Sequence, residues 1–131
     1  MERLYPLALV ILLLATRAVA VEPLPTTGVA LLEACHQAQR LVNGEQGSVN
    51  AGIAGGYCLG YTAALMALSV QVAPENALAQ PLYCLAGALT VGDGVSVIVR
   101  YLESHPDQLQ RDQGVLAIEA LAEAYPCTRA Q

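Results

Sequence analysis

The chain contains no lysine, no tryptophan and no phenylalanine, and each absence narrows what the protein can be. Six basic residues, all arginine, stand against eleven acidic residues, so the net charge is −5. Nucleic acids and anionic lipid headgroups bind basic surfaces, and this balance argues against both as partners. An acidic surface instead suits a basic protein partner.

Motifs for catalysis and metal binding are also missing. The sequence has no C-x-x-C pair, which argues against a zinc site or a redox dithiol. It has no G-x-S-x-G, no H-E-x-x-H and no glycine-rich phosphate loop. Cys35 and His36 are neighbours on a predicted helix and point about 100° apart, so they do not form a nucleophile–base pair.

The remaining candidates for acid–base chemistry are weak. Glu119 and Glu123 are four residues apart, which is more typical of a solvated helix face than of paired catalytic carboxylates. His105 directly precedes a proline, as a turn residue often does. We therefore predict a protein that is not an enzyme and uses no metal ion and no cofactor; a small hydrolase that depends on His105 is the alternative.

The first twenty residues have the pattern of a secretory signal peptide. Arg3 precedes an apolar run, and Ala18-Val19-Ala20 follows it as an A-x-A cleavage site. We predict cleavage after Ala20; the alternative is a retained membrane anchor, for which the run is short. The mature chain, residues 21–131, would be one exported domain without membrane contact, with ten acidic residues and four arginines.

All four cysteines lie in the predicted mature chain, where an even number indicates disulfides. Facing residues of an antiparallel helical hairpin are equally far from its turn. Cys35 and Cys58 are centred on the turn "NGEQGS", and Cys84 and Cys127 on the "HP" dipeptide before the last helix. We predict the pairs Cys35–Cys58 and Cys84–Cys127. The alternative is Cys58–Cys84 with Cys35–Cys127, because the first of these is centred near Pro74.

Four segments show helical periodicity and capping signals. They cover about residues 28–42, 49–73, 94–104 and 113–125, and the expected N-caps are, in order, Thr26 or Thr27, Ser48, Asp93 and Asp112. The run "VSVIV" alone would also fit a strand, but its continuation does not alternate. The predicted fold class is therefore all-α, a small disulfide-bridged bundle of about four main helices.

Two helix faces are expected to pack closely. In the second helix, small residues recur every four positions and form a smooth stripe that would let the first helix approach, with Cys58 facing it: Gly52, Gly56, Gly60 and Ala64. Membrane helices share this pattern, but the polar side chains of the segment favour a buried core helix. In the last helix the expected inner line is Val115, Ile118, Ala122 and Tyr125.

Four short motifs occur in an order and spacing that resemble one known family. "YCLGYTAAL", "YCL", "VIVRYLESHPDQ" and "ALAEAYPC" lie between residues 57 and 127, and the resemblance covers about residues 31–127, almost the whole mature chain. Together with the signal peptide and four cysteines, they resemble the type VI secretion immunity proteins of the Tai and resistance-associated (Rap) group. The resemblance implies a small, all-helical, non-enzymatic periplasmic protein, often a homodimer, that blocks the active-site cleft of a secreted peptidoglycan amidase.

An inhibitor of this kind needs a rigid scaffold that presents a preorganised loop. The loop before the last helix, residues 104–112, carries the polar side chains expected to contact the toxin: Ser104, His105, Asp107, Gln108, Gln110, Arg111 and Asp112. Tyr101 and Glu103 on the adjoining helix could extend this surface. The alternative function is a general periplasmic binding or chaperone-like protein without a toxin partner.

Overall fold

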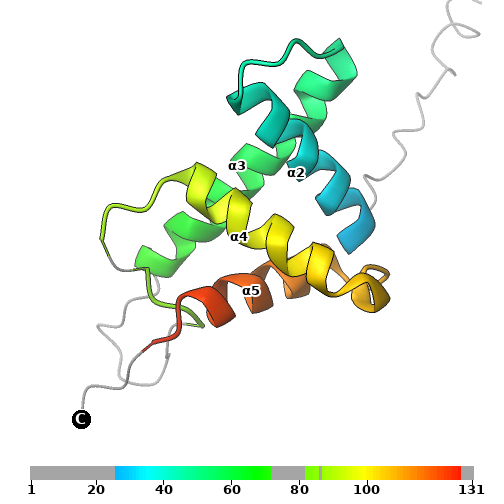
Figure 1. Cartoon of the computed structure of the whole chain (residues 1–131). Helices are drawn as coiled ribbons and strands as arrows, with labels where there is room; N and C mark the ends of the chain where they lie inside the picture. The colour runs from blue at the N-terminus through cyan, green and yellow to red at the C-terminus, as the bar shows by residue number, and fades with distance from the viewer. Residues whose placement is uncertain (1–25, 72–81, 86, 128–131) are drawn as a thin grey trace, which may run out of the picture.

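The computed structural model describes residues 26–71, 82–85 and 87–127, and it is helical throughout these ranges (Figure 1). The predicted signal peptide and residues 72–81 lie outside them. The described elements are α2 (Gly28–Val42), α3 (Val49–Gln71), α4 (Val91–Ser104), the 3-10 turn η1 (Pro106–Gln108) and α5 (Gln113–Ala124). An isolated antiparallel bridge joins Thr27 to Asp112, and there is no strand in the described ranges. The predicted all-α bundle of four main helices is confirmed.

The helices begin where side chains can accept from their free amides. Thr27 caps α2, Ser48 accepts from the amide of Ala51 at the start of α3, and Asp112 caps α5, all as predicted.

The predicted cap of α4 is wrong. Thr90 is the N-cap and Asp93 is the third helical residue, whose carboxylate accepts from the Thr90 amide at 2.8 Å. This reciprocal capping box satisfies two donors at once, and its hydrogen bonds lower the pKa of Asp93. The helix therefore begins before the position that Asp93 alone indicated.

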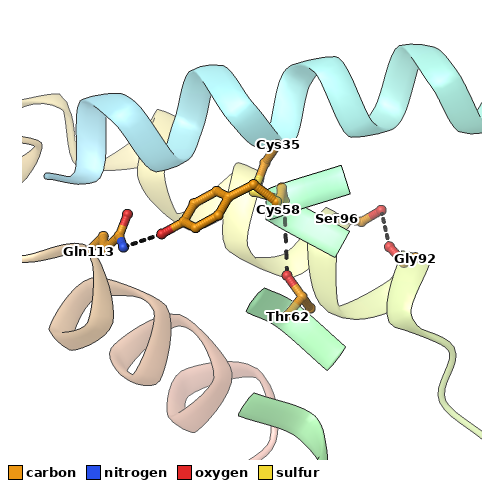
Figure 2. The surroundings of a disulfide bond; sticks show 7 residues. Cys35, Cys58, Thr62, Gly92, Ser96 and Gln113 are labelled. Atoms are coloured by element: carbon orange, nitrogen blue, oxygen red, sulfur yellow. Dashed lines mark hydrogen bonds between the residues drawn. A yellow bond between two sulfur atoms is a disulfide. The ribbon is translucent and has the colours of Figure 1, made fainter. Parts of the chain in front are cut away.

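Both predicted disulfides are present. Cys35 and Cys58, with Cα atoms 5.1 Å apart, join α2 to α3, and both residues are fully buried (Figure 2). Cys84 and Cys127, with Cα atoms 4.8 Å apart, join the segment before α4 to the end of α5. Loop-closure entropy gives each bond a stabilising contribution of about 3–4 kcal/mol.

The core contains aliphatic side chains around α4, which contacts α2, α3 and α5 (Figure 1). Its largest fully buried apolar side chains are Leu31, Ile98, Leu102, Leu116 and Leu121. The "LYCLAG" segment, expected only as a link, adds Tyr83, which is buried and donates from its hydroxyl to the Leu65 carbonyl at 2.6 Å. With neither phenylalanine nor tryptophan available, the two disulfides supplement a core of limited apolar volume.

The predicted inner face of α5 is not its most buried face. The buried apolar residues are Leu116, Ala117, Ala120 and Leu121. The predicted residues Ile118, Ala122 and Tyr125 are only partly buried against the core, and Val115 is 44% exposed. Because the sequence of α5 is apolar on most sides, periodicity alone did not determine its rotation.

The predicted packing of the glycine stripe is also wrong. A Cβ atom at Gly52, Gly56 or Gly60 would meet no other atom within 4 Å, so the stripe faces away from the bundle. Cys58 does face α2, but the close approach occurs at Gly55, one turn earlier on the same side. A Cβ atom there would lie 3.0 Å from the Ala38 amide nitrogen. The disulfide determines the rotation of α3, and the stripe lies roughly opposite.

One side of α3 is consequently exposed. Its stretch Val49–Ser69 is long and apolar enough to cross a membrane by length and composition, and 28% of that stretch is buried. Val49, Ile53 and Leu68 are more than half exposed on this helix, which carries no charged residue. The Cys35–Cys58 bond and the contacts with α2 and α4 make α3 a member of the bundle.

The two disulfides differ in accessibility, and we predict that they are reduced in a fixed order. Thiol–disulfide exchange requires a thiolate to reach a sulfur atom. Cys84 is exposed and Cys127 half-buried, whereas Cys35 and Cys58 have no exposed surface. Titration of the native protein with dithiothreitol, followed by alkylation and peptide mapping, should label Cys84 and Cys127 first. Labelling of Cys35 and Cys58 at the same or a lower concentration would contradict this order.

Candidate functional site

The loop of residues 104–112 lies beside the start of α2, far from it in sequence (Figure 1). The Gly28 amide donates to the Arg111 carbonyl oxygen, and the Val29 amide to the Leu109 carbonyl oxygen, each with an N–O distance of 3.0 Å. The first amides of a helix have no partner within it. The loop supplies those partners, so its backbone position is tied to the end of α2.

The approach of the loop depends on the absence of a side chain at Gly28. A Cβ atom there would lie 2.5 Å from Leu116 Cδ1 and 3.1 Å from the carbonyl oxygen of Leu109. The second of these atoms belongs to the loop backbone and cannot swing aside. Gly28 therefore sets how closely the loop lies on α2.

The far end of the loop is held at the first turn of α5. The Asp112 carboxylate accepts from two amides of that turn, including that of Gly114 at 2.8 Å. The Gln113 amide donates to the Thr26 carbonyl at 2.7 Å, and its side-chain Nε2 donates to the Tyr57 hydroxyl of α3 (Figure 2). The Gln113 side chain is buried, and its Oε1 has no hydrogen-bond partner in the described part of the chain.

The near end of the loop is ordered by local contacts around Tyr101. The His105 ring stacks on the Tyr101 ring with centroids 4.2 Å apart, and His105 Nδ1 lies 2.8 Å from the Tyr101 carbonyl oxygen. Ser104 Oγ donates to the same carbonyl at 2.8 Å. Within the loop, the Gln108 amide donates to the His105 carbonyl and the Arg111 amide to the Gln108 carbonyl.

One cluster, formed by Tyr101, Gln108, Arg111 and Glu119, joins the loop to α4 and α5; we call it the Glu119 cluster. Arg111 donates through both terminal nitrogens to the Glu119 carboxylate, at 2.6 and 3.0 Å, and also to Gln108 Oε1. The Tyr101 hydroxyl donates to Glu119 at 3.1 Å.

These contacts shift three pKa values. The hydrogen bond from Arg111 is the main cause that lowers the pKa of Glu119, and the same bond raises the pKa of Arg111. Burial, and then Glu119, raise the pKa of Tyr101. The ionised pair is thus the favoured state of the cluster.

The structure divides the predicted contact residues into two groups. The side chains of Ser104, His105, Gln108, Arg111 and Asp112 are engaged within the protein. Asp107 and Gln110 are exposed, and neither side chain forms a hydrogen bond or ion pair with the described residues. These two have their full hydrogen-bonding capacity available for a partner.

Sequence reasoning missed Gly28 and the role of Glu119, which was interpreted as part of a solvated face. No pattern could have shown either of them. Arg111 and Glu119 are eight residues apart across a helix start, where no regular spacing brings side chains together. Gly28 acts on Leu109 and Leu116, more than eighty positions away.

The two neighbours Cys35 and His36 are each engaged within the bundle. Cys35 is bonded to Cys58, so its sulfur is not a nucleophile, and the His36 Nε2 lies 2.9 Å from Glu103, linking α2 to α4. Among the described residues, no three His, Cys, Asp or Glu side chains are grouped to hold a metal ion.

A shallow apolar groove of about 500 Å³ lies between α2 and α3. Its lining consists of Ala30, Glu33, Ala34, Asn50, Ile53, Ala54 and Tyr57. Ala30 follows Val29, whose amide donates to the Leu109 carbonyl. The Tyr57 hydroxyl accepts a hydrogen bond from the Gln113 side chain. The groove therefore adjoins the elements that anchor the loop.

We predict that Gly28→Ala destabilises the protein by about 1–3 kcal/mol, because the new methyl group overlaps Leu116 and the Leu109 carbonyl. The matched control is Gly52→Ala, at an exposed helical position with open space, which should be neutral or stabilise by up to about 1 kcal/mol. Urea unfolding measures both. Equal effects of the two substitutions would show that the loop does not depend on contact at Gly28.

Comparison with protein families gives one match. The family model of the Rap1a immunity proteins matches residues 27–127, from the N-cap of α2 to the last cysteine, and so includes the loop and both disulfides. Comparisons with curated proteins and with solved structures gave no match. The disulfides and the immunity family together indicate an exported protein that binds a secreted effector. The chain belongs to the Rap1a immunity protein family.

Proposed function

We propose that this protein is a periplasmic immunity protein that binds and inhibits a peptidoglycan amidase delivered by type VI secretion. Inhibition would protect the cell from its own toxin and from that of sister cells. The family supports an immunity function, and the amidase is the target that the sequence resemblance implies. The proposal assigns contact with the active-site cleft of the toxin to the loop 104–112.

The observation that carries this assignment is that the loop backbone is bonded to α2 on one side and leads directly into the capped start of α5 on the other. A loop that is already ordered loses little conformational entropy when it binds. Asp107 and Gln110 lie exposed on this rigid support, without a side-chain partner among the described residues. The acidic charge of the chain favours association with a basic partner surface.

Occluding a cleft requires no chemistry from the inhibitor. Immunity protein families are generally non-enzymatic, which agrees with the expectation from the sequence. The proposed function accordingly needs no cofactor and no metal ion, only a surface that is complementary to the toxin.

We predict that replacing both Asp107 and Gln110 by alanine weakens toxin binding by at least about tenfold, since each loses a hydrogen-bonding side chain from the contact. The thermal midpoint should not change, because neither side chain is bonded within the described structure. Isothermal titration calorimetry would use a purified peptidoglycan amidase that carries a type VI secretion signal, chosen by adjacency of its gene to the gene for this chain.

The control for this experiment is Glu45→Ala, which removes an exposed side chain from the turn between α2 and α3. It should bind as the wild type does. If the double variant retains full affinity, the loop is not the contact surface; if the wild type itself does not bind or inhibit the amidase, the proposed target is wrong.

The resemblance also implies a homodimer, and we propose that two copies meet through the exposed side of α3. This side is uncharged and carries Val49, Ile53 and Leu68, so two acidic copies can approach there without like charges facing each other. The open space at Gly52, Gly56 and Gly60 would allow the two helices to pack closely.

We predict that Gly56→Arg gives a monomer without loss of thermal stability. A Cβ atom at Gly56 would meet none of the described residues, and an arginine side chain there would block close contact between two α3 helices. Ala124→Arg, at an exposed position near the end of α5, is the control with the same added charge. Sedimentation velocity over a range of concentrations tests both. A monomeric wild type, or a dimeric Gly56→Arg variant, would refute this interface.

A further inference from the structure

Glu119 is placed where three separate elements meet at the loop. Its carboxylate accepts from Arg111 of the loop and from Tyr101 of α4, while its own backbone belongs to α5. Arg111 in turn donates to Gln108, at the end of η1. A planar guanidinium that is paired bidentately with a carboxylate has one preferred geometry, so the pair restrains direction as well as distance.

We propose that Glu119 is a positioning residue that holds the loop 104–112 in a single conformation through Arg111, and that acid releases the loop by protonating this carboxylate. The role rests on the proposed function, in which the loop contacts the toxin. In this proposal Asp107 and Gln110 contact the partner, and the Glu119 cluster holds the backbone that carries them.

The charge state of the cluster determines the pH range of this restraint. Glu119 has a folded-state pKa below its ordinary value of 4.5, so the stabilisation is present above that value and is lost as the pH falls through the lowered pKa. Tyr101 has a folded-state pKa above 10.0, so its donated bond is present below that value and is lost as the pH rises through the raised pKa.

Other charged groups near Glu119 affect whether its carboxylate is ionised. Arg111 and His105 both favour its ionised form. Glu123, one turn further along α5, acts on Tyr101 and is not bonded to Arg111. Release consequently follows protonation of the Glu119 carboxylate itself.

Amide hydrogen exchange of the isolated protein tests the proposal without any toxin. The informative amides are those of Gly28, Val29 and Arg111, which donate to loop carbonyls. At neutral pH, Glu119→Gln should exchange at these positions roughly threefold to fivefold faster than the wild type, the range expected when one exposed bidentate pair is lost. Glu123→Gln removes the same charge from the same helix and should leave the exchange unchanged.

A pH series distinguishes positioning from a general loss of stability. After correction for intrinsic exchange rates, the wild type should reach the faster exchange of the variant as the pH falls through the lowered pKa of Glu119, whereas Glu119→Gln should show no such transition. Exchange within α3 and the thermal midpoint at neutral pH should be similar in all three proteins.

Two results would overturn the proposal: unchanged exchange at the three amides in Glu119→Gln, or a wild-type transition near the pKa of histidine instead of that of glutamate. Either can occur while the Asp107 and Gln110 variant still loses toxin binding. Conversely, failure of the wild type to bind an amidase leaves the exchange result intact, so the two proposals fail separately.

Discussion

The Cys35–Cys58 bond joins α2 to α3 inside the core, and the orientation of both helices follows from it. It requires Cys58 to face α2, which brings Gly55 against the Ala38 backbone and directs the glycine stripe of α3 outward. A core without phenylalanine or tryptophan offers limited apolar area. A covalent link at its centre removes unfolded-state entropy that packing alone would have to overcome.

With α2 oriented in this way, its first turn becomes the support for a distant loop. Helix starts carry unpaired amides, and here two of them bind the carbonyls of Leu109 and Arg111. The same arrangement fixes the loop and completes the helix, so neither is ordered independently of the other. Because these contacts involve the backbone, the loop tolerates substitution of its exposed side chains, which suits the toxin contact that we propose for it.

The outward face of α3 results from the same geometry. Small residues at every fourth position predict close helix packing, but a Cβ atom at Gly52, Gly56 or Gly60 would contact none of the described residues. This face is uncharged and partly apolar on an otherwise acidic protein. Two copies would therefore meet the least electrostatic repulsion there. The loop and this face lie on different elements, so the proposed toxin contact and the proposed dimer contact can be tested separately by substitution.

The sequence by itself determined the helices, three of their four N-caps, both disulfides and the position of the candidate loop, because these depend on local periodicity, side-chain capping and symmetry about turns. It could not determine the rotation of α5 about its axis, since apolar residues occur on most of its sides. Nor could it show that Arg111 is bonded to Glu119, or that Gly28 touches Leu109. Those contacts join positions with no regular spacing, and only the packing of α2, α4 and α5 around a shared core brings them together.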